Sequence, residues 1–368
     1  MACYACGSGG FVEILRKGDV HIWTDTCDAD SMGLKYECIL HQCKSCGHVY
    51  QPVDNNLRNI FNRIYRSRNA QGPSPMGIGK WGLERANTLF FNEIDLTKHR
   101  TAIEIGCGDG YLLKSLRMRG FERLFGIEPS PNVDRGVDGI TFINEFVNGN
   151  RILDEKVDLI YSIAVFEHIE DINSVLQFCR NNIRPHGELF VVVPNAQRQL
   201  ESGDPALFVH QHVHYFTESS LRNVLRQNGF QVSSISSRKD GLSVSARPVV
   251  PVQGPHPTGV MFYNRYQEEL NCILKNIAHL ISEGAVLVHG ACNAMNNIVG
   301  WIGGDFDLVD NDENKQGRTY FGEIVLSPQE IDLERYKTVL VIPTAYYEEI
   351  KEGYLSRGFK GHIVGATK

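Results

Sequence analysis

Two pairs of cysteines are the first residues whose type and spacing could do chemistry. Cys3-x-x-Cys6 and Cys43-x-x-Cys46 are each followed by a glycine. A CxxC pair places two thiolates on one tight turn, and two pairs complete the tetrahedral four-cysteine site that zinc prefers. We therefore expect a bound zinc ion, and a structural one, because four protein ligands leave no position for water. Four reduced cysteines without metal are the alternative. Two further cysteines are rival ligands, Cys27 and Cys38.

A glycine-rich loop is the second such feature. Residues 101–113 read TAIEIGCGDGYLL, in which an apolar strand runs into Gly106-x-Gly108-x-Gly110 and then into an amphipathic pattern. Glycines let the backbone turn sharply and approach a ligand closely. The spacing differs from the G-x-G-x-x-G of dinucleotide-binding loops. The loop therefore predicts a small-molecule cofactor site other than that of a nicotinamide enzyme.

Polar side chains also stand at the ends of the strands that follow. Glu128 ends the strand predicted over residues 124–128, where a carboxylate can accept both ribose hydroxyls of a nucleoside. Asn144 follows the third predicted strand, and Ser162 ends the fourth, residues 158–162. Because ligands of open α/β sheets lie at the carboxyl ends of the strands, we expect these side chains to share one site with the glycine loop.

A histidine-rich segment follows the fifth predicted strand. Residues 208–216 read FVHQHVHYF, and a helix is predicted to begin near Thr217. His210, His212 and His214 would share one side of an extended segment. Histidine titrates near neutral pH and can act as a general base. Three histidines on one side could instead bind a metal, and ordinary loop histidines are a third interpretation.

The surrounding pattern predicts an α/β protein of several parts. Residues 1–56 hold the cysteine pairs, and residues 57–98 form a helical connector with a break at Gly72–Pro75. Residues 99–249 alternate apolar runs with amphipathic stretches, which is typical of βαβ units and a parallel sheet. A proline-rich linker, Pro248–Pro257, leads to residues 258–368, where a helix over residues 262–281 precedes a second strand–helix alternation.

The composition narrows the class of protein. The chain has 368 residues, of which 42% are hydrophobic and 22% charged, as in folded globular proteins. Its net charge of −6 and the lack of a basic stripe argue against nucleic acid as a partner. No apolar run is long enough to span a membrane, and the residues MACYACGSGG lack a signal-peptide core. We therefore expect a cytoplasmic protein with a small-molecule substrate.

The segment E-I-G-C-G-D-G, residues 104–110, resembles the cofactor loop of class I S-adenosylmethionine (SAM)-dependent methyltransferases. The resemblance implies SAM as cofactor, with the glycines shaping a loop around its methionine part. Glu104 would support that loop or the amino group, and Glu128 would hold the ribose. Asn144 is expected near the adenine amine and Ser162 near the methionine part. His168, in the sequence FEHIED, is expected to be structural.

The histidine segment is similar to the signature Y-H-E-H-L-x-Y-F of zinc-containing sugar C-methyltransferases, which act on nucleotide-linked deoxy keto sugars. The matching residues are His210, His212, Tyr215 and Phe216. The resemblance implies a zinc-binding module, a central Rossmann-like SAM domain and a C-terminal Rossmann-like domain. It also implies that His212 is the general base. Our hypothesis adds that His210 or His214 supports this base and that Tyr65 and Tyr215 could polarise a substrate oxygen.

The C-terminal part resembles the same family. Residues 284–291 read as a strand and turn, and residues 307–317 resemble the family's strand followed by D-N-x-x-K-Q-G. C-methylation of a nucleotide-linked keto sugar is thus the expected function. Gln211 and Val209 depart from the signature and favour the alternative, O-methylation of a sugar hydroxyl or of a phosphorylated small molecule. A non-catalytic SAM-binding protein is disfavoured by the intact glycine loop and Glu128. A nicotinamide enzyme is disfavoured because no G-x-G-x-x-G follows Val288.

Overall fold

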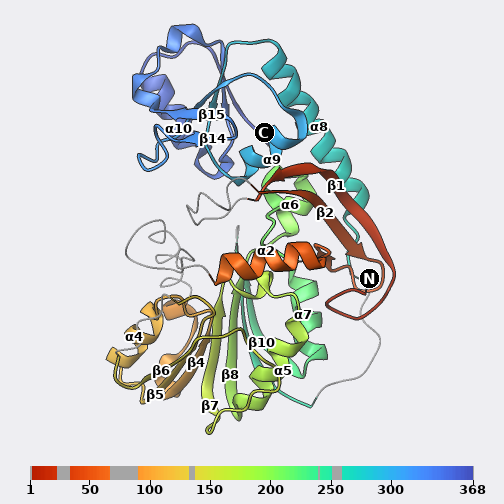
Figure 1. Cartoon of the computed structure of the whole chain (residues 1–368), viewed down its shortest axis with the longest axis vertical. Coiled ribbons are helices and arrows are strands. Elements are labelled where there is room, and N and C mark those ends of the chain that lie inside the picture. The colour runs from red at the N-terminus through yellow and green to blue at the C-terminus, as the bar shows by residue number, and fades with distance from the viewer. Residues whose placement is uncertain are drawn as a thin grey trace.

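The computed structural model describes residues 2–22, 34–66, 90–131, 137–238, 241–250 and 259–367. Within these residues the chain forms three β-sheets, and Figure 1 shows the C-terminal sheet and the largest sheet at opposite ends of the long axis. Cys27, the expected break at Gly72–Pro75 and most of the expected linker lie outside the described residues.

The largest sheet has seven strands in the order β10-β11-β8-β7-β4-β5-β6. Five neighbouring strands are parallel, β4 (Thr101–Ile105), β5 (Arg123–Ile127), β6 (Ile140–Ile143), β7 (Val157–Ile163) and β8 (Ile183–Val193). The expectation of a parallel sheet is therefore wrong at one edge, because β10 (Phe230–Ser237) and β11 (Leu242–Pro248) are antiparallel. Their connection is too short for the crossover that parallel strands require.

Helices cover both faces of this sheet, which explains why its central strands are buried along almost their whole length. All five residues of β4 are buried. On one face α5 (Ile172–Asn182) and α7 (Glu218–Gln227) contribute to a large core, and on the other α4 (Tyr111–Met118) packs into a second core. The helix expected near Thr217 is confirmed, since the Thr217 side chain accepts the N–H of Ser220 in a capping box.

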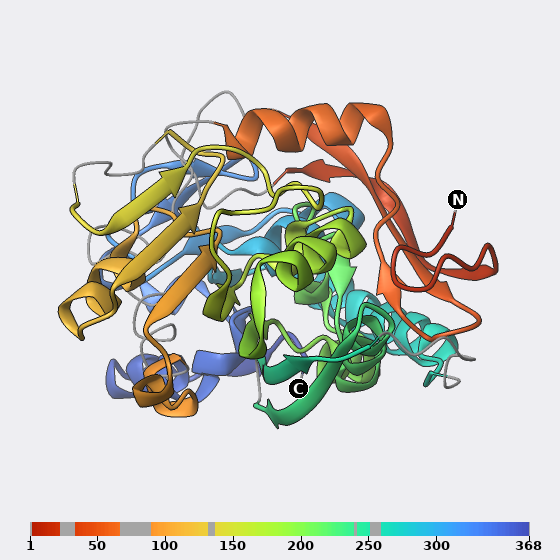
Figure 2. The same ribbon diagram turned by 90° about the horizontal axis from the view of Figure 1, so that it is seen from below.

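A four-stranded sheet contains both the cysteine segments and part of the histidine segment. Its order is β1-β2-β3-β9, formed by β1 (Phe11–His21), β2 (Lys35–Cys43), β3 (Val49–Tyr50) and β9 (His214–Tyr215). The first three strands come from the N-terminal segment, whereas β9 belongs to the chain after β8. Helix α2 (Asn55–Tyr65) follows β3 and runs from this sheet toward the seven-stranded one (Figures 1 and 2).

The C-terminal sheet has the order β14-β15-β13-β12-β16-β17. Its strands are β12 (Val286–His289), β13 (Asp307–Val309), β14 (Thr319–Tyr320), β15 (Glu323–Leu326), β16 (Thr338–Val341) and β17 (His362–Gly365). The expected long helix is confirmed as α8 (Tyr263–Ser282) and is followed by α9 (Asn293–Ile302) and α10 (Tyr347–Ser356). Both α8 and α9 share a hydrophobic core with β1 and β2. None of the helices in the described residues is long and apolar enough to cross a membrane.

Candidate active site

The glycine loop needs glycine at its first and last positions. It connects β4 to α4, and Gly106 and Gly110 have φ values of 75° and 76°, which side chains rarely adopt. A Cβ on Gly106 would lie 2.3 Å from Cγ2 of Val165, and one on Gly110 would lie 2.8 Å from Cζ of Phe142. The loop is therefore held in a sharp turn at the carboxyl end of β4 that side chains at these two positions would disrupt.

The carboxylate of Glu128 lies across this loop. Its Oε2 accepts the N–H of Gly108 at 3.1 Å, and its Oε1 accepts the N–H of Ser130 at 2.9 Å. Burial raises its pKa. The amide nitrogen of Asn144 donates to the carbonyl oxygens of Glu128 and Ser130 at 2.8 and 2.7 Å. The structure thus brings three of the predicted cofactor-binding residues into direct contact at the ends of β4, β5 and β6.

Glu104 and Ser162 lie beneath the loop, within the sheet. The hydroxyl of Tyr161 donates to Oε2 of Glu104 at 3.0 Å, and burial raises the pKa of Glu104 well above its usual value. The hydroxyl of Ser162 donates to the carbonyl of Ile105 at 3.1 Å and is fully buried. Both side chains hold β7 against β4 directly below Gly106, and their contact with a cofactor stays a prediction.

The histidine segment does not place its three histidines on one side of an extended strand, and that expectation is wrong. The chain turns at residues 210–211, and the N–H of His212 donates to the carbonyl of Val209 at 2.9 Å. His210 contacts the carbonyl oxygen of Tyr36 through Nε2 at 3.1 Å. His214 contacts Nε2 of His48 through Nδ1 at 2.9 Å. His210 and His214 are both 1% exposed and face the N-terminal segment.

His212 instead meets residues that follow β7. Its ring centroid lies 4.9 Å from that of His168, and one ligand atom each of Glu167, His168 and His212 lie within 4.8 Å of one another. The hydroxyl of Tyr65, at the end of α2, lies 3.0 Å from Nδ1 of His168. Burial, with a smaller effect of His168, lowers the pKa of His212 well below its usual value. His212 is therefore neutral at pH 7, the state in which it can accept a proton.

Tyr215 lies beside this cluster, but its hydroxyl is hydrogen-bonded to the backbone of the histidine segment. Its ring centroid is 6.1 Å from that of His212. Its hydroxyl donates to the carbonyl of Val209 at 3.1 Å and accepts the N–H of the same residue at 3.2 Å. Burial raises its pKa above the usual value of a tyrosine. These contacts close the turn that carries His212, and a direct role of Tyr215 toward a substrate stays a prediction.

The four predicted metal-ligating cysteines meet in the N-terminal segment. Their sulfur atoms lie within 4.8 Å of one another, with Cys3 and Cys46 3.8 Å apart and Cys6 and Cys43 3.6 Å apart. A tetrahedral zinc ion with Zn–S bonds of about 2.3 Å separates its sulfur atoms by roughly 3.8 Å, so the thiols fit this ion. The glycines after the pairs, Gly7 and Gly47, have φ values of 72° and 71° and donate their N–H groups to the carbonyls of Cys3 and Cys43.

Comparison with known proteins identifies the part of the chain that carries the glycine loop. Residues 82–235 match a family described as a methyltransferase domain. The chain contains a methyltransferase domain. The enzyme class expected from the sequence is thereby confirmed for this part of the chain. Residues 282–363 match a second family, described as C2185-like, N-terminal.

Relatives of the methyltransferase domain differ in the atom that their names say they methylate. The chain is 29% identical over 154 residues to the C-methyltransferase NovU of Streptomyces niveus. The matched segment covers 40% of this chain and 36% of that protein. The chain is 25% identical over 172 residues to malonyl-[acyl-carrier protein] O-methyltransferase 1 of Coxiella burnetii, covering 45% of this chain and 57% of that protein. A solved structure described as a DhpI-SAM-HEP complex matches 54% of this chain and 100% of its own with a TM-score of 0.44 at 16% identity.

Two residues of the methyltransferase domain were missed as members of the site. Glu167 and His168 lie in a short 3₁₀ turn, Phe166–His168, directly after β7. The sequence contained a signal for them, because residues just after a strand of an open α/β sheet lie at the same edge as the cofactor loop. The interpretation of His168 as structural agrees with its Nδ1, which donates to the carbonyl of Gln211 at 2.9 Å, but it gave no weight to the position of His168 at this edge. Its contact with His212 depends on the fold of the histidine segment, which the pattern did not predict.

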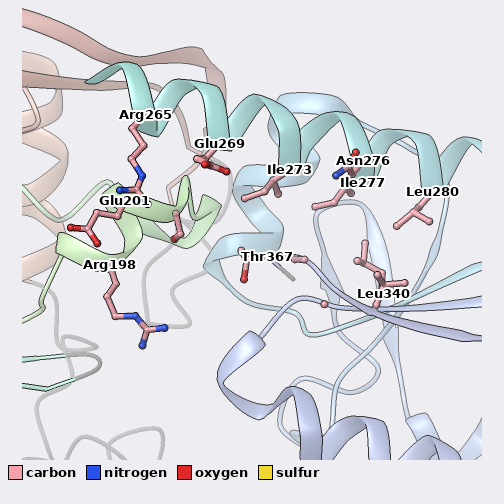
Figure 3. Close-up of a pocket in the computed structure, with 14 residues that line it drawn as sticks. Arg198, Glu201, Arg265, Glu269, Ile273, Asn276, Ile277, Leu280, Leu340 and Thr367 are labelled. Atoms are coloured by element: carbon pink, nitrogen blue, oxygen red, sulfur yellow. The ribbon is translucent and has the colours of Figure 1, made fainter. Parts of the chain in front are cut away.

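A separate cavity of about 530 Å³ lies between α6 (Gln197–Ser202), α8 and the C-terminal sheet. Figure 3 shows Arg198 and Glu201 on α6 near Arg265 and Glu269 on α8, with Ile273 and other apolar side chains further along α8. Neither the glycine loop nor His212 lines it. Since two arginines and two glutamates surround its polar end, the cavity favours no ligand charge.

Proposed function

We propose that the protein transfers the methyl group of SAM to a carbon atom of a nucleotide-linked keto sugar, with His212 as the general base. The observation that carries this proposal is the cluster of His212, His168 and Tyr65 at the edge of the sheet that also carries the glycine loop and Glu128. The proposal assigns a substrate class and a general base to the methyltransferase domain.

The loop residues fit SAM. Gly106 and Gly110 hold the positive φ values of a sharp turn, and glycine lets such a backbone approach the methionine part closely. The Glu128 carboxylate, anchored by the amides of Gly108 and Ser130, would accept the ribose hydroxyls. When bound, SAM supplies an electrophilic methyl group on a sulfonium. Every other requirement of the reaction falls on the acceptor and on the residues that hold it.

C-methylation requires a carbon nucleophile. Neutral His212 would take the proton from the carbon next to the ketone, and the electron pair of that C–H bond would form an enolate. The enolate carbon then forms the bond to the methyl group as the S–CH₃ bond breaks, and the sulfur keeps the electron pair. The Tyr65 hydroxyl, which lies 3.0 Å from Nδ1 of His168, would stabilise the enolate oxygen by donating a hydrogen bond. Nδ1 of His168 donates to the carbonyl of Gln211 at 2.9 Å, and this contact holds its ring beside His212.

An O-methyltransferase acting on a sugar hydroxyl or on a phosphorylated small molecule is the second candidate. Gln211 and Val209 favour it because they replace residues of the C-methyltransferase signature. One relative is also named as an O-methyltransferase. In that case His212 would deprotonate a hydroxyl group, so the same base would serve both reactions.

A third candidate arises from Glu167, His168 and His212, since two histidines and a carboxylate could hold a divalent cation. Turnover that is lost on dialysis against a chelator and restored by a divalent cation, with the cysteine-bound metal unchanged, would favour a metal here over a free base.

The four cysteines are proposed to hold a structural zinc ion. Their sulfur separations and the two glycine turns support it. Cys38 is buried in β2 outside this cluster, which disfavours it as a ligand. Elemental analysis of the purified protein should find one zinc ion per chain.

The deciding experiment uses SAM with a ¹³C-labelled methyl group and a panel of nucleotide-linked keto sugars. A new methyl carbon bonded to a sugar carbon in the NMR spectrum supports the proposal. Label on a sugar oxygen supports the O-methyltransferase. If SAM binds but no sugar gains the label, the proposed substrate class is wrong.

A further inference from the structure

Gln51 connects the N-terminal segment to the histidine turn through three hydrogen bonds. Its backbone N–H donates to the carbonyl of Val213 at 2.9 Å. Its side-chain Nε2 donates to the carbonyl of His210 at 2.6 Å and to the carbonyl of His212 at 3.0 Å. Gln51 is 1% exposed. One buried amide group therefore holds the backbone on both sides of the turn and at His212 itself.

The same region is fixed by strand pairing and by a histidine pair. Tyr50 pairs with His214 as β3 meets β9. His214 also contacts the carbonyl oxygen of Ile169 through Nε2 at 2.8 Å, so Nε2 carries the proton and Nδ1 accepts from Nε2 of His48. His48 follows the cysteine turn, and its carbonyl accepts the N–H of Cys43. A continuous set of contacts thus leads from the cysteines to the turn that carries His212.

We propose that Gln51 is a positioning residue that fixes His212 for proton abstraction by holding the histidine turn against the N-terminal sheet. This inference rests on the proposed function for its catalytic consequence. Within the described residues, Oε1 of Gln51 is buried without a hydrogen-bond partner. A buried, unsatisfied acceptor is destabilising. The amide of Gln51 is therefore explained by the two hydrogen bonds that it donates, because neither a carboxylate nor an apolar side chain could donate them.

Gln51→Glu tests the proposal with almost no change of shape. The variant presents carboxylate oxygens to the carbonyl oxygens of His210 and His212, and the two sets of oxygens repel each other. Deuterium uptake of the amides of residues 208–216 should rise, while uptake in α5 stays unchanged. The rate of methyl transfer at saturating SAM should fall on the order of 100-fold, as expected for a base displaced by about 1 Å. The Kd of SAM should change less than about twofold, because the hydrogen bonds of Gln51 in the described residues go to the histidine turn and not to the glycine loop.

Gln42→Glu is the matched control. Gln42 is equally buried and donates through Nε2 to the carbonyls of Gly47 and Val260, both at 2.9 Å, but it does not contact the histidine turn. The Gln42→Glu variant should destabilise the N-terminal segment. Deuterium uptake of residues 208–216 should not rise above the uptake of the residues around them. Gln51→Met, which removes the donors without adding charge, should raise the uptake of the turn in the same way and covers the case in which Gln51→Glu fails to fold.

Unchanged deuterium uptake of residues 208–216 in both Gln51 variants would overturn the proposal. An equal increase there in Gln42→Glu would also overturn it, since the effect would then be general instability. Because uptake is measured without substrate, this test stands even if the wild-type protein methylates no keto sugar, which would contradict only the proposed function.

Discussion

At the scale of single residues, the environment of His212 determines the pH range of activity. Burial and the neighbouring His168 lower its pKa, so the imidazole stays neutral below the pH at which an exposed histidine becomes protonated. Activity depends on the neutral form and is lost as the pH falls through this lowered pKa. We therefore expect the acidic limb of the kcat/KM profile to lie below about 6.5, the usual histidine value. A limb at or above that value would exclude His212 as the base.

His212→Asn should lower kcat by about 10²–10⁴-fold, the range that a general base contributes. The asparagine retains a similar volume but cannot accept the proton. SAM affinity should not change, because no hydrogen bond or ring contact in the described residues joins His212 to the glycine loop. Rapid-quench measurement of single-turnover transfer, together with calorimetry of SAM binding, separates the two effects. Full turnover in the variant would exclude His212 as the base.

Glu128→Gln should weaken SAM binding by about 10- to 100-fold, since a hydrogen bond to a charged group contributes about 1.5–3 kcal/mol. The variant also keeps only one side-chain oxygen for the amides of Gly108 and Ser130, which Glu128 holds with one oxygen each. Glu122→Gln is the control, because this exposed carboxylate lies just before β5 and outside the loop. Calorimetry with SAM measures both, and equal effects in the two variants would contradict the assignment of Glu128.

At the scale of elements, the glycine loop can be tested by comparing two glycines. Gly106 and Gly120 both have positive φ values, 75° and 87°, but a Cβ on Gly120 would meet nothing within 4 Å. Gly120→Ala should cost about 1 kcal/mol from its backbone conformation alone. Gly106→Ala adds the clash with Val165, so its free energy of unfolding should fall by a further 1–3 kcal/mol, about the cost of overpacking. Urea denaturation of both variants measures the difference.

The features that the sequence predicted are those whose residues lie close together in the chain or follow a known spacing. The glycine loop, the capped start of α7 and the four-cysteine cluster follow from residues close together in the chain or from a ligand set of fixed spacing. The antiparallel edge formed by β10 and β11 did not follow, because alternating apolar runs do not distinguish a hairpin from a crossover. The turn at His210 was also not predictable, since it depends on pairing with a segment of the N-terminal part.

At the scale of the whole molecule, zinc removal should affect stability before chemistry. Replacing Cys46 by serine should abolish the predicted zinc stoichiometry and lower the midpoint of thermal unfolding, because a structural metal contributes folding energy directly. Cys38→Ser should keep the metal, since this buried thiol lies outside the cluster. Metal content and thermal unfolding should be measured on the same samples. Retention of one zinc ion by the Cys46 variant would argue against the four-cysteine site.

The pairing of β3 with β9 also constrains how the chain folds during synthesis. His48 and His214 are 166 residues apart in the sequence, yet they lie in contact within one small sheet. As the ribosome releases the chain, the N-terminal strands emerge long before their last partner exists. That sheet is therefore completed only after most of the seven-stranded sheet has been made, and contacts of such long sequence separation form slowly. A ribosome-bound chain that stops before β9 should leave the edge of β3 open to proteases and chaperones.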